Sequence, residues 1–269
     1  MWSFLSSNGL ASSTLSVFRE QLHTLWFGLY SRGGKGDLGS SGFEHVFVGE
    51  YENSDVEGQH YWVQFYELEK IGQINYHGWF DRQKDVQISM QYAWNTHQKM
   101  LGGFLIGTSP EFDFSLFTLC TLAKPGAHAC PFMLDTYNAD VTSYQDTTTN
   151  AVKVATAYTT TTTGGSAPGS TTTGKPNADG LGDLVNAMRA ADVGKAQPGD
   201  IVLNWGNHVK GTTDVSPQPF FTHVNENLFN RQTYNVLHQI LDRNLFDPQV
   251  CDVESTNGLK TGLEQQFIN

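Results

Sequence analysis

A single low-complexity stretch, residues 159–177, limits how this chain of 269 residues can fold. It consists almost entirely of Thr, Gly, Ser and Pro, which offer little apolar surface to bury and favour a flexible, solvated backbone. A stretch of this kind is typical of a linker between folded parts. We therefore expect two such parts, residues 1–158 and residues 178–269.

The composition predicts a folded chain and excludes several classes of protein. Hydrophobic residues make up 39% and aromatic residues 12%, whereas charged residues make up only 16%, fewer than in disordered or coiled-coil chains. The formal net charge of -11 excludes a generally cationic surface for nucleic acid, so RNA or DNA binding would need a local patch or a bound metal. No apolar run approaches the roughly 18 residues that cross a bilayer, so we expect no membrane partner. Residues 1–5 do not resemble a signal peptide, and the sequence indicates no compartment.

The two parts differ in the secondary structure that their residue patterns predict. Residues 1–32 carry apolar residues near the helical period, and residues 44–158 are dominated by short β-type runs. A helix is expected among these runs, because Ser109 and Pro110 precede an acidic first turn. Residues 178–269 are expected to be mostly helical, so the predicted fold class is α+β. Strands are expected at 46–48, 61–66, 86–90, 152–158 and 201–203.

Two histidines and a lysine could carry chemistry. His45 and His60 each begin a predicted strand, just after glycines and turn residues, where a rigid element can present a side chain to a cleft. Two imidazoles facing one substrate can act as acid and base, because their ordinary pKa lies at about 6.5. Lys99, in a predicted polar turn, could stabilise charge on a phosphate. Histidines at strand ends and solvated lysines are more often ordinary residues, so this pattern alone is a weak indication.

The three cysteines leave two interpretations open. Cys120 and Cys130 flank a turn at residues 124–126 and could form a disulfide, which would leave Cys251 unpaired. Alternatively, all three are ordinary thiols. The sequence has no CxxC motif, so a zinc site built on thiolates is not expected.

Several longer motifs resemble the EndoU family of uridylate-specific endoribonucleases. The segment SGFEHVFVGE at residues 41–50 is close to the first signature of that family, and further agreement occurs at residues 26–32, 107–112 and 155–158.

By this resemblance, the catalytic positions fall on His45, His60 and Lys99. The positions that contact the base and the substrate fall on Thr156 and Tyr158.

The resemblance also matches Glu44 and Glu50 to acidic residues tied to activity and metal dependence. It implies a divalent cation, Mn2+ or in some members Ca2+. Two carboxylates fall short of the roughly six or more oxygen ligands that Ca2+ takes, so the sequence leaves the metal site unknown. An alternative role for both glutamates is to orient the histidines.

The order of the segments departs from the family. Residues 178–269, which include PQPFFTHVNE, resemble the amino-terminal lobe that precedes the catalytic lobe in ordinary members. We therefore expect a circularly permuted, two-lobed EndoU-like fold, with a β-rich catalytic lobe in residues 1–158, a linker at 159–177 and a mostly helical lobe in 178–269. This order predicts that residues 267–269 and residues 1–5 are neighbours.

The resemblance implies an endoribonuclease that cleaves single-stranded, uridine-containing RNA through the ribose 2'-hydroxyl. The products would be 2',3'-cyclic phosphate and 5'-hydroxyl ends, and we expect the chain to act as a monomer. The alternative is an RNA-binding module on the same fold with little or no catalysis. The presence of His45, His60 and Lys99 favours the enzyme.

Overall fold

The computed structural model describes the chain except for residues 33–37, 53, 135–136, 149, 162–179, 243–265 and 269. Helices and sheets both occur, in keeping with the predicted α+β class. None of the helices in the described ranges is long and apolar enough to cross a membrane.

Two sheets with their covering helices make up the part of the chain before residue 162. The elements, in order, are α1 (Trp2–Ser7), α2 (Leu15–Phe27), η1 (Glu44–Val48), β1 (Glu50–Glu52), β2 (Asp55–Glu57), α3 (Trp62–Lys70), β3 (Ile74–Gln83), β4 (Gln87–Trp94), β5 (His97–Leu105), α4 (Pro110–Ala123), β6 (Gly126–Leu134), β7 (Tyr137–Asp146) and β8 (Lys153–Thr161).

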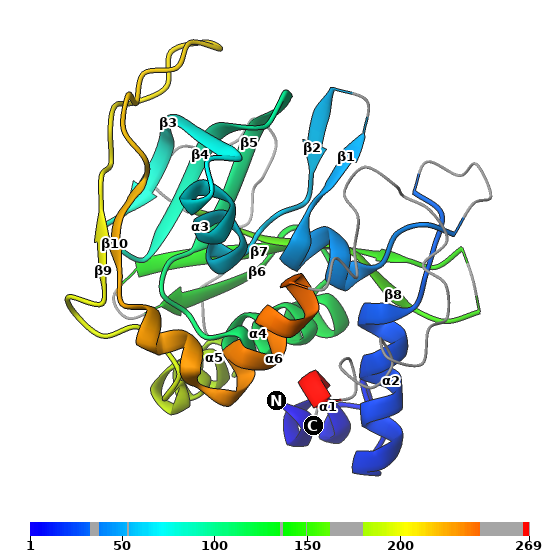
Figure 1. The fold of residues 1–269 in the computed structure, drawn as a ribbon. Coiled ribbons are helices and arrows are strands. Elements are labelled where there is room, and N and C mark those ends of the chain that lie inside the picture. The colour runs from blue at the N-terminus through cyan, green and yellow to red at the C-terminus, as the bar shows by residue number, and fades with distance from the viewer. Residues whose placement is uncertain are drawn as a thin grey trace.

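The larger sheet has the strand order β1-β2-β5-β4-β3, in which β2 and β5 run parallel and the other pairs are antiparallel. The smaller sheet is antiparallel, with the order β6-β7-β8. Figure 1 shows α3 against the larger sheet and α4 beneath the smaller one. The helix predicted after Ser109 is confirmed as α4, and the Ser109 hydroxyl caps it by accepting the N–H of Phe112 at 3.2 Å.

Two segments that were expected to be strands are helical. Residues 62–66 open α3, and residues 46–48 belong to η1, a single turn of π-helix. Short apolar runs rich in aromatic and β-branched residues suit a buried helix as well as a buried strand. In α3 the buried residues Trp62, Phe65 and Leu68 recur at helical spacing, so packing of one helix face decides the outcome.

The strands expected near residues 86–90, 152–158 and 201–203 are confirmed as β4, β8 and β9. Strand β8 continues to Thr161, so residues 159–161, which had been assigned to the linker, are paired with β7. The rest of the expected linker lies outside the described residues.

The remaining elements pack onto this framework and share its core. They are α5 (Leu181–Ala191), β9 (Ile201–Leu203), β10 (Phe221–Val224), η2 (Glu226–Asn230) and α6 (Gln232–Asp242). The ring of Phe220 lies 6.2 Å from that of Phe65, and Tyr234 is fully buried at 6.4 Å from Trp62. Figure 1 shows the β9–β10 hairpin alongside β3, and the segment after β9 extends the sheet, since Val209 donates its N–H to the carbonyl of Trp79.

Cys120 and Cys130 form a disulfide that ties the end of α4 to β6, with Cα atoms 5.6 Å apart. The disulfide interpretation of these two cysteines therefore holds. Cys251 lies outside the described residues.

Candidate active site

His45 lies in η1 rather than at the start of a strand, and its side chain is almost fully buried. Its Nδ1 is 3.0 Å from Oε1 of Glu50, and its Nε2 is 3.0 Å from the hydroxyl of Thr156. Because a carboxylate only accepts, Nδ1 carries the proton and Nε2 receives the Thr156 hydroxyl hydrogen. The unprotonated nitrogen of His45 therefore faces β8.

His60 reaches His45 because glycine at position 58 lets two backbone segments touch. A Cβ on Gly58, whose φ is +64°, would lie 1.8 Å from the carbonyl oxygen of His45. The close approach allows Gln59 to donate its N–H to that oxygen at 2.8 Å. As a result, the rings of His45 and His60 lie 5.9 Å apart.

The other contacts of His60 fix its orientation. Nδ1 lies 3.3 Å from the carbonyl oxygen of Gly103 in β5, so this nitrogen is the donor and Nε2 is left unprotonated in the neutral ring. The ring of Tyr158 lies 5.0 Å away, measured between centroids. His60 lies two residues before Trp62, the first residue of α3, and Tyr61 between them is the N-cap of this helix.

Lys99 lies on strand β5, not in a polar turn as its sequence context suggested. Its side chain is buried, and Nζ donates to the carbonyl oxygen of Val56 at 2.9 Å. Burial lowers the pKa of Lys99 to about 8, although Glu57 and other acidic groups oppose the shift. The lysine is therefore a cation near neutral pH that can lose its proton in mildly alkaline solution.

Besides burial, the positive charge of Lys99 acts on both imidazoles and lowers the pKa of each. Burial, followed by the positive charges of Arg32 and Lys99, holds the pKa of His45 well below its usual value. Burial, followed by Lys99 and His45, does the same to the pKa of His60. Both rings are thus neutral at pH 7 in the free protein, and a bound phosphate would favour protonation of either one.

Arg32 is a site residue that the sequence argument did not single out. Its Nε lies 3.3 Å from the Glu50 oxygen that also holds His45, and its Nη2 donates to the carbonyl oxygen of Ala155 at 2.9 Å. The only signal in the sequence was its place in one of the family-like segments, residues 26–32. Glu44 is buried in η1 directly before His45.

Alternate residues of β8 carry the expected substrate contacts. Thr156 and Tyr158 are both half-buried and lie on one face of the strand, whereas Ala157 between them is fully buried. The first touches His45 and the second touches His60. The structure therefore brings four of the five residues expected at the catalytic and substrate-binding positions into one connected cluster with Glu50. Lys99 makes no direct contact with this cluster, but its charge acts on both histidines.

The described residues do not fit a protein-only metal site. No group of three or more His, Cys, Asp or Glu side chains within them is arranged to hold an ion. The Glu50 carboxylate is already occupied by His45 and Arg32. Mn2+ or Ca2+ bound at this site would therefore need most of its ligands from elsewhere.

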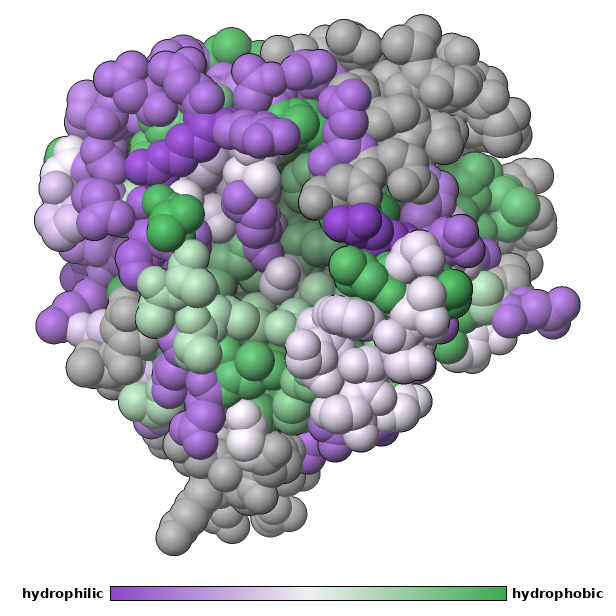
Figure 2. Space-filling model, turned by 90° about the horizontal axis from the view of Figure 1, so that it is seen from below, coloured by the Kyte–Doolittle hydropathy of each residue, from purple (hydrophilic) through white to green (hydrophobic). Residues whose placement is uncertain are grey.

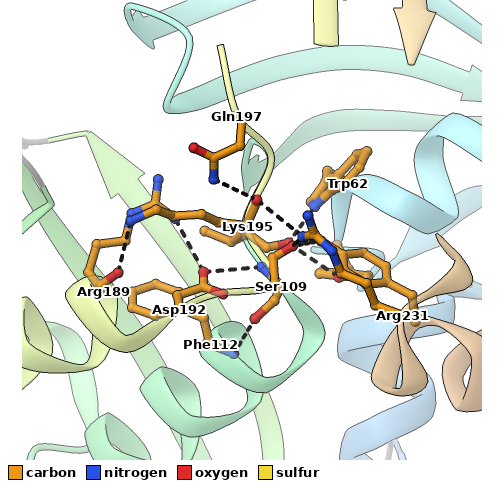
Figure 3. Close-up of polar contacts among 12 residues, drawn as sticks. Trp62, Ser109, Phe112, Arg189, Asp192, Lys195, Gln197 and Arg231 are labelled. Carbon is orange, nitrogen blue, oxygen red and sulfur yellow. Dashed lines mark hydrogen bonds and ion pairs between the residues drawn. The ribbon is translucent and has the colours of Figure 1, made fainter. Parts of the chain in front are cut away.

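A second polar network joins the carboxy-terminal elements to the turn between β5 and α4. The carbonyl oxygen of Thr108 accepts hydrogen bonds from Nε1 of Trp62 at 2.8 Å and from the hydroxyl of Tyr234 at 3.2 Å. Figure 3 shows Asp192 beside Ser109, whose N–H it accepts at 3.4 Å. Trp62 follows His60 by two residues, so α5 and α6 help to fix the segment that carries the histidine.

Comparisons with known proteins agree with this arrangement. A family model described as Endoribonuclease XendoU matches residues 1–159. The uridylate-specific endoribonuclease of Mus musculus is 42% identical over 171 residues, which cover 59% of this chain and 40% of that protein. Uridylate-specific endoribonuclease D of Xenopus laevis is 46% identical over 127 residues, which cover 45% of this chain and 41% of that protein.

One solved structure is also similar, titled "The structure of XendoU: a splicing independent snoRNA processing endoribonuclease". The match has 33% sequence identity and a TM-score of 0.50, and it covers 60% of this chain and 61% of the other. The alignments span only about 40% of the length of the curated relatives.

Proposed function

This chain belongs to the XendoU family of endoribonucleases, and on that premise we propose that it cleaves single-stranded RNA at uridylates. The observation that carries the proposal is the placement of His45 and His60 with their rings 5.9 Å apart, each in contact with a half-buried residue of β8. A scissile phosphodiester between the two Nε2 atoms would have a proton acceptor on one side and a proton donor on the other.

The reaction is a transphosphorylation in which the RNA supplies its own nucleophile. One imidazole removes the proton of the uridine 2'-hydroxyl, and O2' then bonds to phosphorus. The bond from phosphorus to O5' of the next nucleotide breaks, and the other imidazole, protonated after the phosphate binds, gives its proton to O5'. The products are a 2',3'-cyclic phosphate and a 5'-hydroxyl, and Lys99 stabilises the negative charge on the phosphorane.

The substrate contacts follow from the face of β8 that meets the histidines. The Thr156 hydroxyl, 3.0 Å from His45, is placed to exchange this contact for the uracil edge when RNA binds. The ring of Tyr158 would stack on the base or sugar, as aromatic side chains do in single-stranded RNA sites. We propose that the chain does this as a monomer. We also propose that the activity depends on Mn2+ or Ca2+, although the proton transfers by the two imidazoles do not themselves involve either ion.

We further propose that residues 178–269 correspond to the amino-terminal part of the family, in permuted order. The family match ends at residue 159, and an alignment that follows one chain order stops where a permutation begins. The described residues of the segment 178–269 nevertheless share a core with the matched part, as the packing of Tyr234 on Trp62 illustrates.

The two chain ends support the same proposal. The ring of Phe267 lies 5.2 Å from Phe43 and 5.3 Å from Phe114. Met1 and Ile268 line one cavity of about 390 Å³. Figure 1 shows the two ends side by side, and Figure 2, viewed from below, shows hydrophobic residues gathered around the middle of this face. A short connection there would restore the ordinary order.

The rival function is RNA binding with little or no cleavage. An oligonucleotide that contains one uridine, with ribose or with 2'-deoxyribose at that position, separates the two possibilities, and mass spectrometry identifies the ends. We expect cleavage after the ribouridine only, with a cyclic phosphate end, and the assay is run with and without added Mn2+ as its two arms. Tight binding without products would favour the rival, and cleavage of the deoxyuridine strand would mean that water is the nucleophile.

A further inference from the structure

A third residue on the same face of β8 also contacts a histidine. Beyond Thr156 and Tyr158, the next side chain on this face is that of Thr160, and its hydroxyl lies 3.2 Å from Nδ1 of His128 in β6. Thr160 and His128 are half-buried, so solvent reaches them, whereas the intervening Thr159 is buried on the other face. The contacts that define the catalytic cluster therefore continue along the strand.

His128 is held in place by an unusual piece of backbone. The pairing of β6 with β7 shifts register around it, and its φ of +50° lies in the left-handed region that is costly for a residue with a side chain. Its own N–H donates to the Thr142 hydroxyl at 3.0 Å. Two residues on, Cys130 donates its N–H to Asp140 at 3.1 Å and is bonded to Cys120.

These contacts fix the backbone that carries the imidazole, and the imidazole itself contacts the Thr160 hydroxyl. Glycine would adopt this backbone conformation without cost, so the backbone alone does not account for a histidine here. Strain of this kind, kept in place by surrounding contacts, is found preferentially at ligand-binding positions. The strained backbone therefore points to a role for the imidazole of His128.

The chemistry around His128 suits an anionic oxygen. When the Thr160 hydroxyl donates to Nδ1, Nε2 carries the proton and becomes a donor. The buried carboxyl of Asp140 lies near enough for His128 to lower its pKa, although burial has the larger effect and raises that pKa to about 6.

We propose that His128, positioned by Thr160, binds the RNA phosphodiester next to the scissile one. Successive side chains on one face of a strand are about 6.6 Å apart, so Thr160 lies one such step beyond Tyr158. This step is of the same order as the distance between neighbouring phosphates in an extended single strand. The proposal rests on the proposed function, since it extends that site by one nucleotide.

The test compares substrates that differ by one phosphate. Cleavage of a uridine-containing dinucleotide, which has only the scissile phosphate, is measured beside that of oligonucleotides extended by one nucleotide on either side. The variant His128→Gly removes the imidazole and relieves the backbone, and His128→Asn keeps a residue that tolerates the left-handed region. His223→Ala removes an exposed histidine of β10 and is the matched control.

We expect His128→Gly to raise KM roughly tenfold for one of the extended substrates, the effect of one hydrogen bond to a charged group, and to leave the dinucleotide unchanged. Equal losses on all three substrates, or no loss on any, would overturn the proposal.

Binding of 2'-deoxyuridine strands of the same lengths is measured in parallel. If the wild-type protein binds them but cleaves no RNA, the proposed function fails. The subsite is then tested by binding alone: His128→Gly should lose affinity for a longer strand but not for the dinucleotide. If it neither binds these strands nor cleaves RNA, both proposals fail.

Discussion

Glu50 holds His45 through a 3.0 Å contact between Oε1 and Nδ1, and both side chains are almost fully buried. This contact fixes the tautomer and directs Nε2 toward β8. Glu50→Gln preserves the shape of the side chain but removes the charge that favours the imidazolium. We expect kcat to fall by about a hundredfold or more while KM changes little, because the loss is felt mainly when His45 carries charge.

Steady-state cleavage assays at several substrate concentrations separate kcat from KM in this variant. Glu20→Gln, on the exposed face of α2, is a suitable control that should behave as wild type. A thermal melt accompanies both. Wild-type kcat in Glu50→Gln would contradict an orienting role, and a fall in kcat matched by loss of folded protein would assign Glu50 to stability instead.

The pKa of Lys99 predicts the pH above which activity declines. Burial lowers its pKa to about 8, so the ammonium group loses its proton as pH rises through that value. If the charged form stabilises the phosphorane, kcat/KM begins to fall at a pH of about 8, and not near pH 10, where an ordinary lysine loses its proton. The measurement is kcat/KM across this range at constant ionic strength.

Lys99→Arg provides the comparison for this profile, because guanidinium keeps its charge throughout the range. Its activity at pH 7 should be lower, since the arginine fork does not match the single contact to Val56. Its alkaline fall should nevertheless disappear. An unchanged alkaline limb in the arginine variant would show that another group titrates there.

The histidines could be found from the sequence, but their setting could not. His45 and His60 stood beside glycines, and glycine at position 58 does allow the contact between their backbones. The type of local structure was wrong in both places, because a run such as residues 61–66 suits a strand or a helix equally. Only the packing of Phe65 and its neighbours against the sheet selects the helix.

The convergence of distant residues lies further beyond sequence patterns. Thr156 meets His45 across 111 positions, and its place was predicted from a family resemblance rather than from any local signal. Arg32 was missed because a long basic side chain near a turn is usually solvated. Its contact with Glu50 depends on the tertiary packing that brings Arg32, which follows α2, next to the start of β1.

Glu69 connects α3 to the carboxy-terminal part of the chain, and its removal should destabilise the folded protein. Its two carboxyl oxygens accept the N–H groups of Phe220 and Phe221 at 2.7 and 2.9 Å. Glu69→Ala leaves two buried donors without an acceptor, so we expect the free energy of unfolding to fall by about 3 kcal/mol. Chemical denaturation measures this change.

Glu67→Ala, on the same helix, is the matched control for Glu69. Its carboxylate lies 4.0 Å from His238 in a half-exposed ion pair, which should contribute less than about 1 kcal/mol. Equal destabilisation by both variants would mean that helix α3 itself, rather than its clamp on Phe220, is being weakened.

The permuted order predicts that this chain can be returned to the ordinary one. A rearranged gene would begin near residue 180, run to residue 269, continue through a few added residues into Met1 and end near residue 161. Because Phe267 packs on Phe43 and shares a cavity with Met1, a short connection should join the ends without moving the core. We expect the rearranged protein to melt within a few degrees of the original and to cleave the same uridine oligonucleotide. A second version with a long Gly/Ser connection tests the distance itself: if only that version folds, the two ends lie farther apart than the structure places them, and if neither folds, the two orders are not equivalent.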